Sequence, residues 1–295
     1  MLKILCSMIF VLLFVSSNTY GKEKLNVVTS IAPLAYFIEN IGGDRVNVTT
    51  LIPPAGNPHT YEPTPRQMNT LSKADLYVKV GSGIEFELVW MKRIKDINKN
   101  MPVCDASGGI TLIDANDHEH AKDHINENGH SHHGAKDPHI WLSPVNAIVI
   151  TQNIRDSLSE ADPEDSDFYH TNASELIDKL NNLKQKIMAT LGGISKRKFY
   201  IFHPAWGYFA RDFDLEQIPV ELSGKEPTPG RLEALVKRAM NEKIDVIFSS
   251  PQSSSKSAEV IAREIKGKVV FIDPMSDDYL NNLENTTRLL QENLK

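Results

Sequence analysis

Residues 164–192 read EDSDFYHTNASELIDKLNNLKQKIMATLG and form one long periodic segment. Its large apolar residues recur every three or four positions, which is the spacing of one buried helical face: Leu176, Leu180, Leu183, Ile187 and Leu191. The Gly192-Gly193 pair marks the end of the predicted helix. Because a helix rises about 1.5 Å per residue, about 28 residues cover about 42 Å, which is enough to bridge two lobes.

Short strands alternate with helices on both sides of this segment. On the N-terminal side we predict strands over 25–30, 46–52 and 76–80, and helices over 33–42, 64–72, 85–97 and 144–158. On the C-terminal side we predict strands over 198–202, 246–249 and 269–272, and helices over 206–212, 228–241, 255–265 and 278–293. This alternation is typical of βαβ units and of largely parallel sheets. The sequence therefore predicts two α/β lobes with a cleft between them.

Composition limits the class of protein. The 295 residues are 41% hydrophobic and 24% charged, which excludes a disordered chain and fits two domains. The formal net charge of −6 argues against nucleic-acid binding, because that function needs a basic face. Two cysteines are too few for a disulfide framework or a thiolate zinc cluster.

Residues 1–21 have the pattern of a secretory signal peptide. Lys3 precedes an apolar run over 4–15, and small polar residues then lead to Gly21, after which we expect cleavage. A membrane span needs about 20 apolar residues, and this run is shorter. The alternative to cleavage is a signal anchor that the protein retains. Cleavage would remove Cys6 and leave Cys104 as a lone thiol, which we expect to be buried. We therefore expect an exported, soluble protein without disulfides.

Six of the ten histidines gather in one polar segment, 115–136, which has no periodicity and is expected to be a solvated, mobile loop. They are His118, His120, His124, His130, His132 and His133. Such tracts bind metal loosely and in many geometries, which predicts an auxiliary zinc trap. The alternative is a solvated linker whose histidines contribute little to binding.

Three other histidines stand in proline-rich contexts that follow a predicted strand or open a helix. They occur in Asn57-Pro58-His59, in Asp137-Pro138-His139 and in Phe202-His203-Pro204. Ligand sites of open α/β sheets gather at the carboxyl ends of strands, and three imidazoles leave one position of a tetrahedral zinc site open. Separations of 80 and 64 residues carry no local ligand spacing, so three hydrogen-bonded structural histidines remain the alternative.

Nearby carboxylates have two interpretations as well. Asp273, at the end of the last predicted strand, would fill the fourth position, although Asp-Pro after a strand is also a common turn or helix cap. Asp137 and Glu62 would accept hydrogen bonds from imidazole N–H groups, an arrangement that metal sites usually need. Trp141, Trp206 and Tyr208 would shield the site from water or belong to the core.

The segments around His59, His139 and His203, together with residues 221–227 (ELSGKEP) and Ile272-Asp273-Pro274, closely resemble the zinc/manganese solute-binding proteins of ABC importers. The resemblance covers nearly all of the chain after residue 21. It implies a periplasmic protein whose α/β lobes are joined by one long rigid backbone helix, with the metal in the interlobe cleft. It also implies His59, His139, His203 and Asp273 as ligands, and a membrane permease with its ATPase as partner.

Within this family the chain resembles the zinc members. A third imidazole at His203 favours Zn²⁺ over Mn²⁺, which prefers oxygen ligands, and manganese or another divalent metal is the alternative. A histidine-rich loop is also typical of zinc members, although the one here is short. The resemblance implies that the rigid helix limits lobe movement, so that metal release involves local shifts in one lobe.

The expected domain organisation is a signal peptide (1–21), an N-terminal lobe (22–160), a linking helix (161–193) and a C-terminal lobe (194–295). We expect a monomeric Zn²⁺ carrier with no enzymatic activity, because the sequence lacks His-Glu-x-x-His, Gly-x-Ser-x-Gly and Walker-type motifs. A zinc-dependent hydrolase and a metal-binding adhesin are the less favoured alternatives.

Overall fold

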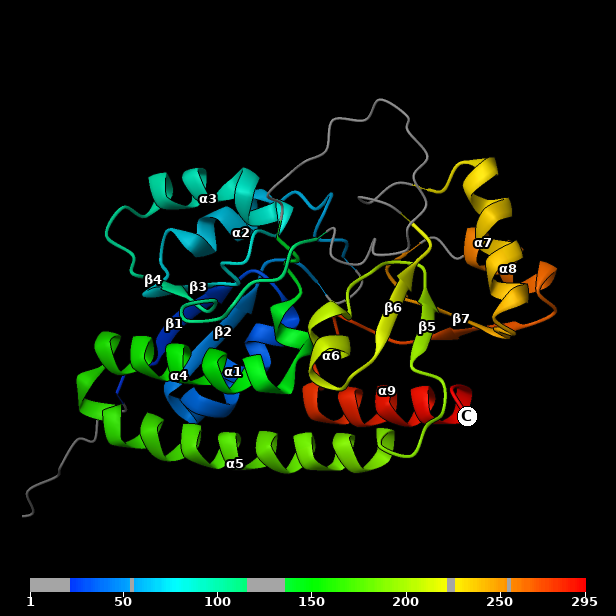
Figure 1. Cartoon of the computed structure of the whole chain (residues 1–295). Coiled ribbons are helices and arrows are strands. Elements are labelled where there is room, and N and C mark those ends of the chain that lie inside the picture. Colours follow the sequence, from blue (N-terminus) through cyan, green and yellow to red (C-terminus); the bar gives the residue numbers. More distant parts are fainter. Residues whose placement is uncertain (1–21, 54–55, 116–135, 222–225, 254–255) are drawn as a thin grey trace, which may run out of the picture.

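The computed structural model describes residues 22–53, 56–115, 136–221, 226–253 and 256–295 (Figure 1). The predicted signal peptide and the six histidines of the loop lie outside the described residues. Within those ranges, no helix combines the length and the hydropathy that a membrane crossing requires.

The first sheet has four parallel strands in the order β2-β1-β3-β4. The strands are β1 (Leu25–Thr29), β2 (Val46–Thr50), β3 (Leu76–Lys79) and β4 (Val103–Asp105). The helices around it are α1 (Ala32–Gly42), α2 (Pro65–Leu71), α3 (Glu85–Ile97) and α4 (Pro144–Ala161). Figure 1 shows α2 and α3 on one side of this sheet and α1 and α4 on the other. Both faces of the sheet are therefore covered, as parallel sheets require.

The second sheet repeats this strand order as β6-β5-β7-β8, again with every pair parallel. Its strands are β5 (Lys198–Ile201), β6 (Glu216–Pro219), β7 (Val246–Ser249) and β8 (Lys268–Phe271). The helices of this half are α6 (Gly207–Asp212), α7 (Pro229–Asn241), α8 (Lys256–Glu264) and α9 (Tyr279–Asn293). The two predicted α/β lobes with parallel sheets are thus confirmed.

The long helix α5 (Ser166–Leu191) connects the two halves. The five apolar residues that predicted its inner face are all buried, and Tyr169 and Ala173 extend that face toward the N-terminus. In Figure 1, α5 runs beneath α4 and α9, and it packs against both and against α1. One helix therefore supports the cores of both sheets.

Several helices begin at a hydroxyl residue followed by proline. The Thr64 and Thr228 side chains accept hydrogen bonds from the amides of Gln67 and Arg231, 3.4 Å each, at the starts of α2 and α7. Ser143 accepts from the Asn146 amide (3.0 Å) at the start of α4. The side-chain oxygen satisfies an amide that has no partner inside the helix, and proline supplies the helical φ in the first turn.

A continuous hydrophobic core runs from the first sheet through α5 to one face of the second sheet. A smaller core lies between the second sheet and α7 and α8. Hydrogen bonds between the halves add to the larger core: Trp141 Nε1 donates to the Pro274 carbonyl, and the Tyr279 hydroxyl donates to the Trp141 carbonyl, 2.7 Å each. The Tyr208 hydroxyl donates to the Asp137 carbonyl, also at 2.7 Å. The two lobes are thus joined by buried contacts as well as by α5.

Two strands, β4 and β6, are absent from the sequence-based expectation. Both are edge strands of three or four residues, and neither VCD nor EQIP has a clear apolar alternation. Such strands form because a neighbouring strand offers its hydrogen-bonding edge, which a local pattern does not reveal.

Cys104 of β4 is buried as expected, and burial raises the pKa of its thiol to about 11.

Candidate metal centre

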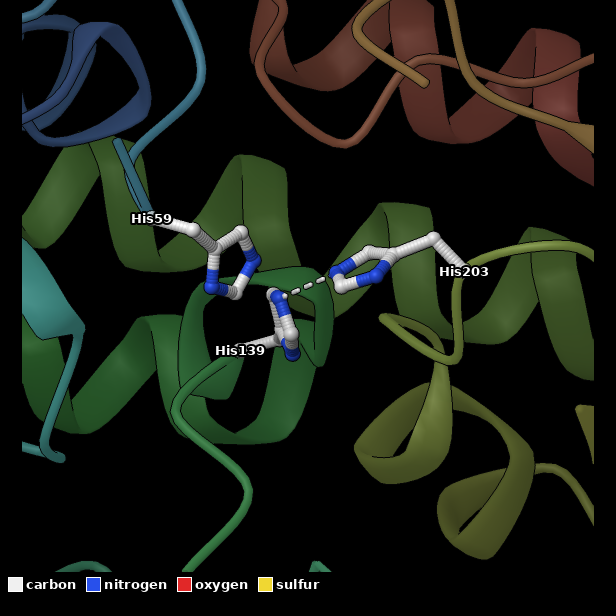
Figure 2. A group of neighbouring side chains, drawn as sticks. All are labelled: His59, His139 and His203. Carbon is white, nitrogen blue, oxygen red and sulfur yellow. Dashed lines mark hydrogen bonds between the residues drawn. The ribbon is translucent and has the colours of Figure 1, made fainter. Parts of the chain in front are cut away.

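Three imidazoles converge from three separate connections (Figure 2). His59 lies in the turn between β2 and α2, His139 directly precedes a 3-10 turn (Ile140–Leu142) that leads into α4, and His203 follows β5. The connections after β2 and β5 leave from the carboxyl ends of parallel strands, where open α/β sheets place their ligand sites. The fold therefore brings together side chains that are 80 and 64 residues apart.

The spacing of the rings suits a small tetrahedral metal ion. Each of the three histidines offers one ring nitrogen, and these nitrogens all lie within 4.8 Å of one another. Nε2 of His139 and Nε2 of His203 are 3.2 Å apart. A zinc–nitrogen bond of about 2.0–2.1 Å places two ligands of a tetrahedral ion about 3.3 Å apart. The His139–His203 pair thus matches the separation that zinc requires.

Each imidazole also has a carboxylate behind it. His59 Nδ1 lies 2.8 Å from Oε2 of Glu85, and His139 Nδ1 lies 2.7 Å from Oδ1 of Asp137. His203 Nδ1 pairs with Oε1 of Glu221. An ionised carboxylate only accepts hydrogen bonds, so Nδ1 carries the proton and Nε2 is left with the lone pair that binds metal.

The surroundings shift the pKa of His59 and that of His139 in opposite directions. The hydrogen bond to Glu85 raises the pKa of His59, against the opposing effect of burial. Burial lowers the pKa of His139, against the raising effect of Asp137. Burial would raise the pKa of Glu85, but the hydrogen bond and charge of His59 lower it overall. Burial therefore favours the neutral form of His139, which is the form that binds a metal.

The histidines line a cavity of about 350 Å³ between the two halves of the molecule. Trp141 and Met275 contribute apolar walls, and Ser250 and Gln252, which follow β7, contribute polar groups. Trp141 lies against His139, with ring centroids 5.4 Å apart. Of the three aromatic residues for which shielding and core packing were both open, Trp206 and Tyr208 belong to the core, and Trp141 is buried and also lines the cavity.

The remaining predicted site residues have varied placements. Among the described residues, the cluster holds His59, His139 and His203 but not Asp273, whose Oδ1 accepts from Gln252 Nε2 and from the Met275 amide, 2.8 Å each. Glu62 is exposed, and the carboxylate beside His59 belongs to Glu85. Asp114, which directly precedes the histidine-rich segment, forms an antiparallel bridge with Lys136, the last residue of that segment.

Sequence reasoning missed the roles of Glu85 and Glu221. Glu85 reads as the first residue of a helix, where acidic residues are common for local reasons. Glu221 lies two residues after the unpredicted edge strand β6, although it begins the ELSGKEP segment that carries part of the resemblance. Only its position in that segment could have singled it out.

Comparison with known proteins identifies the family of the chain. The family model described as periplasmic zinc-uptake complex component A (ZnuA) matches residues 27–293. The chain belongs to this family. The resemblance inferred from the sequence is therefore confirmed at the level of the family.

Individual members of the family share much of the chain. The high-affinity zinc uptake system protein ZnuA of Bacillus subtilis is 34% identical over 281 residues, covering 94% of this chain and 84% of that protein. The zinc-binding protein AdcA of Streptococcus pyogenes is 30% identical over 273 residues, covering 88% of this chain. The chain spans about half the length of AdcA, 52%.

A solved structure shows the same fold. A crystal structure of ZnuA superimposes with a TM-score of 0.85 at 37% sequence identity. The match covers 92% of this chain and all of that one. The arrangement of two parallel-sheet lobes on a long helix is thus shared with a solved member of the family.

Proposed function

We propose that this protein is the extracytoplasmic substrate-binding component of a high-affinity zinc ABC importer. It captures Zn²⁺ in the cleft and delivers it to a membrane permease that works with an ATPase. The observation that carries the proposal is the convergence of His59, His139 and His203, each backed by a carboxylate. Family membership and the zinc-uptake role named for the Bacillus subtilis relative support it.

In this proposal the Nε2 atoms of the three histidines bind the ion. The fourth donor is Asp273 or a water molecule. Because Oδ1 of Asp273 accepts two hydrogen bonds within its own lobe, Oδ2 is the oxygen that would coordinate. Zn²⁺ is favoured over Mn²⁺ because all three clustered donors are imidazole nitrogens, whereas Mn²⁺ prefers carboxylate and other oxygen ligands.

The proposed carrier needs capture and release but no reaction at the metal. A hydrolase would use the open fourth position to activate water and would need a positioned general base. The three carboxylates nearest the rings each face an Nδ1 atom, so they orient the ligands.

We propose the histidine-rich segment, 115–136, as an auxiliary trap that raises the local zinc concentration.

Competitive zinc titration by calorimetry tests the site. The forms to compare are the wild type, a variant lacking 115–136, His59→Ala, and His170→Ala as a matched control, because His170 is exposed on α5 and lies outside the cluster. We expect His59→Ala to weaken tight binding by about 100-fold or more, since loss of a residue that merely orients a ligand already costs about 10–100-fold.

The control and the deletion variant should both keep one tight site. If tight binding is lost with 115–136 and kept in His59→Ala, the three-histidine site is wrong, and the protein is better described as a zinc buffer. If His170→Ala behaves like His59→Ala, the effect of removing a histidine is not specific to the cleft.

A further inference from the structure

The three histidine–carboxylate pairs differ in their exposure to solvent. The side chains of His139 and Asp137 are 11% and 3% exposed, and those of His203 and Glu221 are 15% and 9% exposed. The side chain of His59 is 29% exposed, and that of Glu85 is 49% exposed. The site therefore has two enclosed sides and one side that faces water.

The peptide segment that carries His139 is held from both halves of the molecule. Asp137 Oδ1 accepts from the His139 amide as well as from its ring, at 2.9 and 2.7 Å. Ser82 donates to the Pro138 carbonyl at 2.5 Å, and Tyr208 of the second half donates to the Asp137 carbonyl. A ring held in this way needs little ordering when metal binds.

His203 is fixed by the second sheet. The amide of Phe202 donates to the Phe248 carbonyl (2.8 Å), and the amide of Glu221 donates to the Phe202 carbonyl (3.1 Å). These bonds continue the pairing of β5 with β7 and β6 up to the ligand and to its carboxylate. The ring and its partner are thus held at adjacent strand ends.

The turn that carries His59 is held more locally. Asn57 accepts from the His59 amide through Oδ1 (2.9 Å), and its carbonyl accepts from the amides of Thr60 and Tyr61, at 3.1 and 3.0 Å. These bonds close a self-contained turn of the kind that asparagine favours. The ring itself is held by Glu85, the first residue of α3.

We propose that the His59–Glu85 pair is the exchange side of the site, where the metal enters and leaves. Zinc first binds the His139–His203 pair, whose Nε2 atoms already lie 3.2 Å apart, and His59 then closes over the ion. In release His59 leaves first, and Glu85 is the positioning residue that sets how fast it leaves. This inference rests on the proposed function, because it concerns release from the same three-histidine site.

Release kinetics of two matched variants test this proposal. Glu85→Gln and Glu221→Gln each remove one carboxylate from an Nδ1 atom while keeping side-chain size and one acceptor oxygen. The zinc-loaded full chain is mixed with excess EDTA in a stopped-flow instrument, and zinc loss is followed at several EDTA concentrations. We expect Glu85→Gln to release zinc about tenfold faster than Glu221→Gln, within the 10–100-fold range that such partners contribute.

The Glu85→Gln rate should rise with EDTA concentration at low chelator and level off at high chelator, where the departure of His59 sets the rate. Equal rates for the two variants, or faster release from Glu221→Gln, would overturn the proposal. The equilibrium titration separates this failure from that of the proposed function. If the wild type has no tight zinc site that depends on His59, the proposed function and the exchange role of His59 are both refuted. If the tight site is normal but the two variants release zinc at equal rates, only the exchange role of His59 is refuted.

A second pair of variants keeps the test usable if the buried change at Glu221 prevents folding. Asn57→Ala removes the acceptor of the His59 amide, and Asn57→Ser restores a neutral oxygen that supports a similar turn more weakly. We expect faster zinc release from Asn57→Ala than from the wild type and partial recovery in Asn57→Ser. Unchanged release in Asn57→Ala would contradict the proposal, because the turn would then not limit the departure of His59.

Discussion

Each imidazole of the site faces a carboxylate from a different part of the chain. The partner of His139 lies two residues away, whereas those of His59 and His203 lie 26 and 18 residues away, at Glu85 and Glu221. The local partner, Asp137, is the one that the sequence predicted. Glu62, the local choice for His59, is exposed instead. Sequence proximity thus identified the correct acceptor only for His139, where Asp137 lies in the same short turn.

Zinc affinity should fall as the pH falls, because protonated imidazole does not bind metal. Glu85 raises the pKa of His59, so this ligand becomes protonated at a higher pH than an ordinary histidine. Replacing Glu85 with Gln removes that effect, so the pH at which affinity is half lost should move down, even though affinity at high pH is weaker. Competitive titration of both forms between about pH 5 and 8 measures this midpoint. A midpoint that stays in place or moves up would contradict the assignment.

Among the elements, α5 was the most completely predicted and β4 and β6 were missed. Helix α5 has seven buried residues at helical spacing, so its own sequence specifies both the helix and its inner face. The strands β4 and β6 each pair with one neighbour at the edge of a sheet. Their conformation depends on β3 and β5, which lie elsewhere in the sequence.

Leu180→Ala tests the structural role of α5. Leu180 is fully buried on the face that supports the continuous core, so we expect the free energy of unfolding to fall by about 2–5 kcal/mol. Its neighbour Lys179 is exposed, and Lys179→Ala should change that free energy by no more than about 0.5 kcal/mol. Urea denaturation of the zinc-free proteins compares the two. If the free energy of unfolding falls no more in Leu180→Ala than in Lys179→Ala, the buried face of α5 does not stabilise the core.

At the scale of the whole molecule, the two halves share one core and are joined by buried hydrogen bonds. Trp141 lies at the centre of these bonds, because its indole donates to Pro274 and its carbonyl accepts from Tyr279. A wide hinge motion would have to break these bonds and separate the core around α5 and α9. This arrangement is consistent with the expectation that release involves local movement.

Small-angle X-ray scattering of the zinc-free and zinc-loaded protein measures the extent of movement. We expect closely similar radii of gyration, because opening the lobes would expose the apolar core and leave buried polar groups without partners. A clear decrease on zinc binding, as in hinge-type binding proteins, would contradict the prediction. The Glu85→Gln variant should give the same profiles, because its effect is confined to one ligand.

The sequence by itself determined the alternation of strands and helices, the long helix and the choice of three proline-flanked histidines. These features depend on neighbouring residues, since apolar spacing, caps and prolines act over a few positions along the backbone. Only the tertiary structure decided that His59, His139 and His203 meet, that Glu85 and Glu221 stand behind two of them, and that one side faces water. Those outcomes depend on how two sheets pack against one helix, which places residues far apart in the chain within a few ångströms of each other.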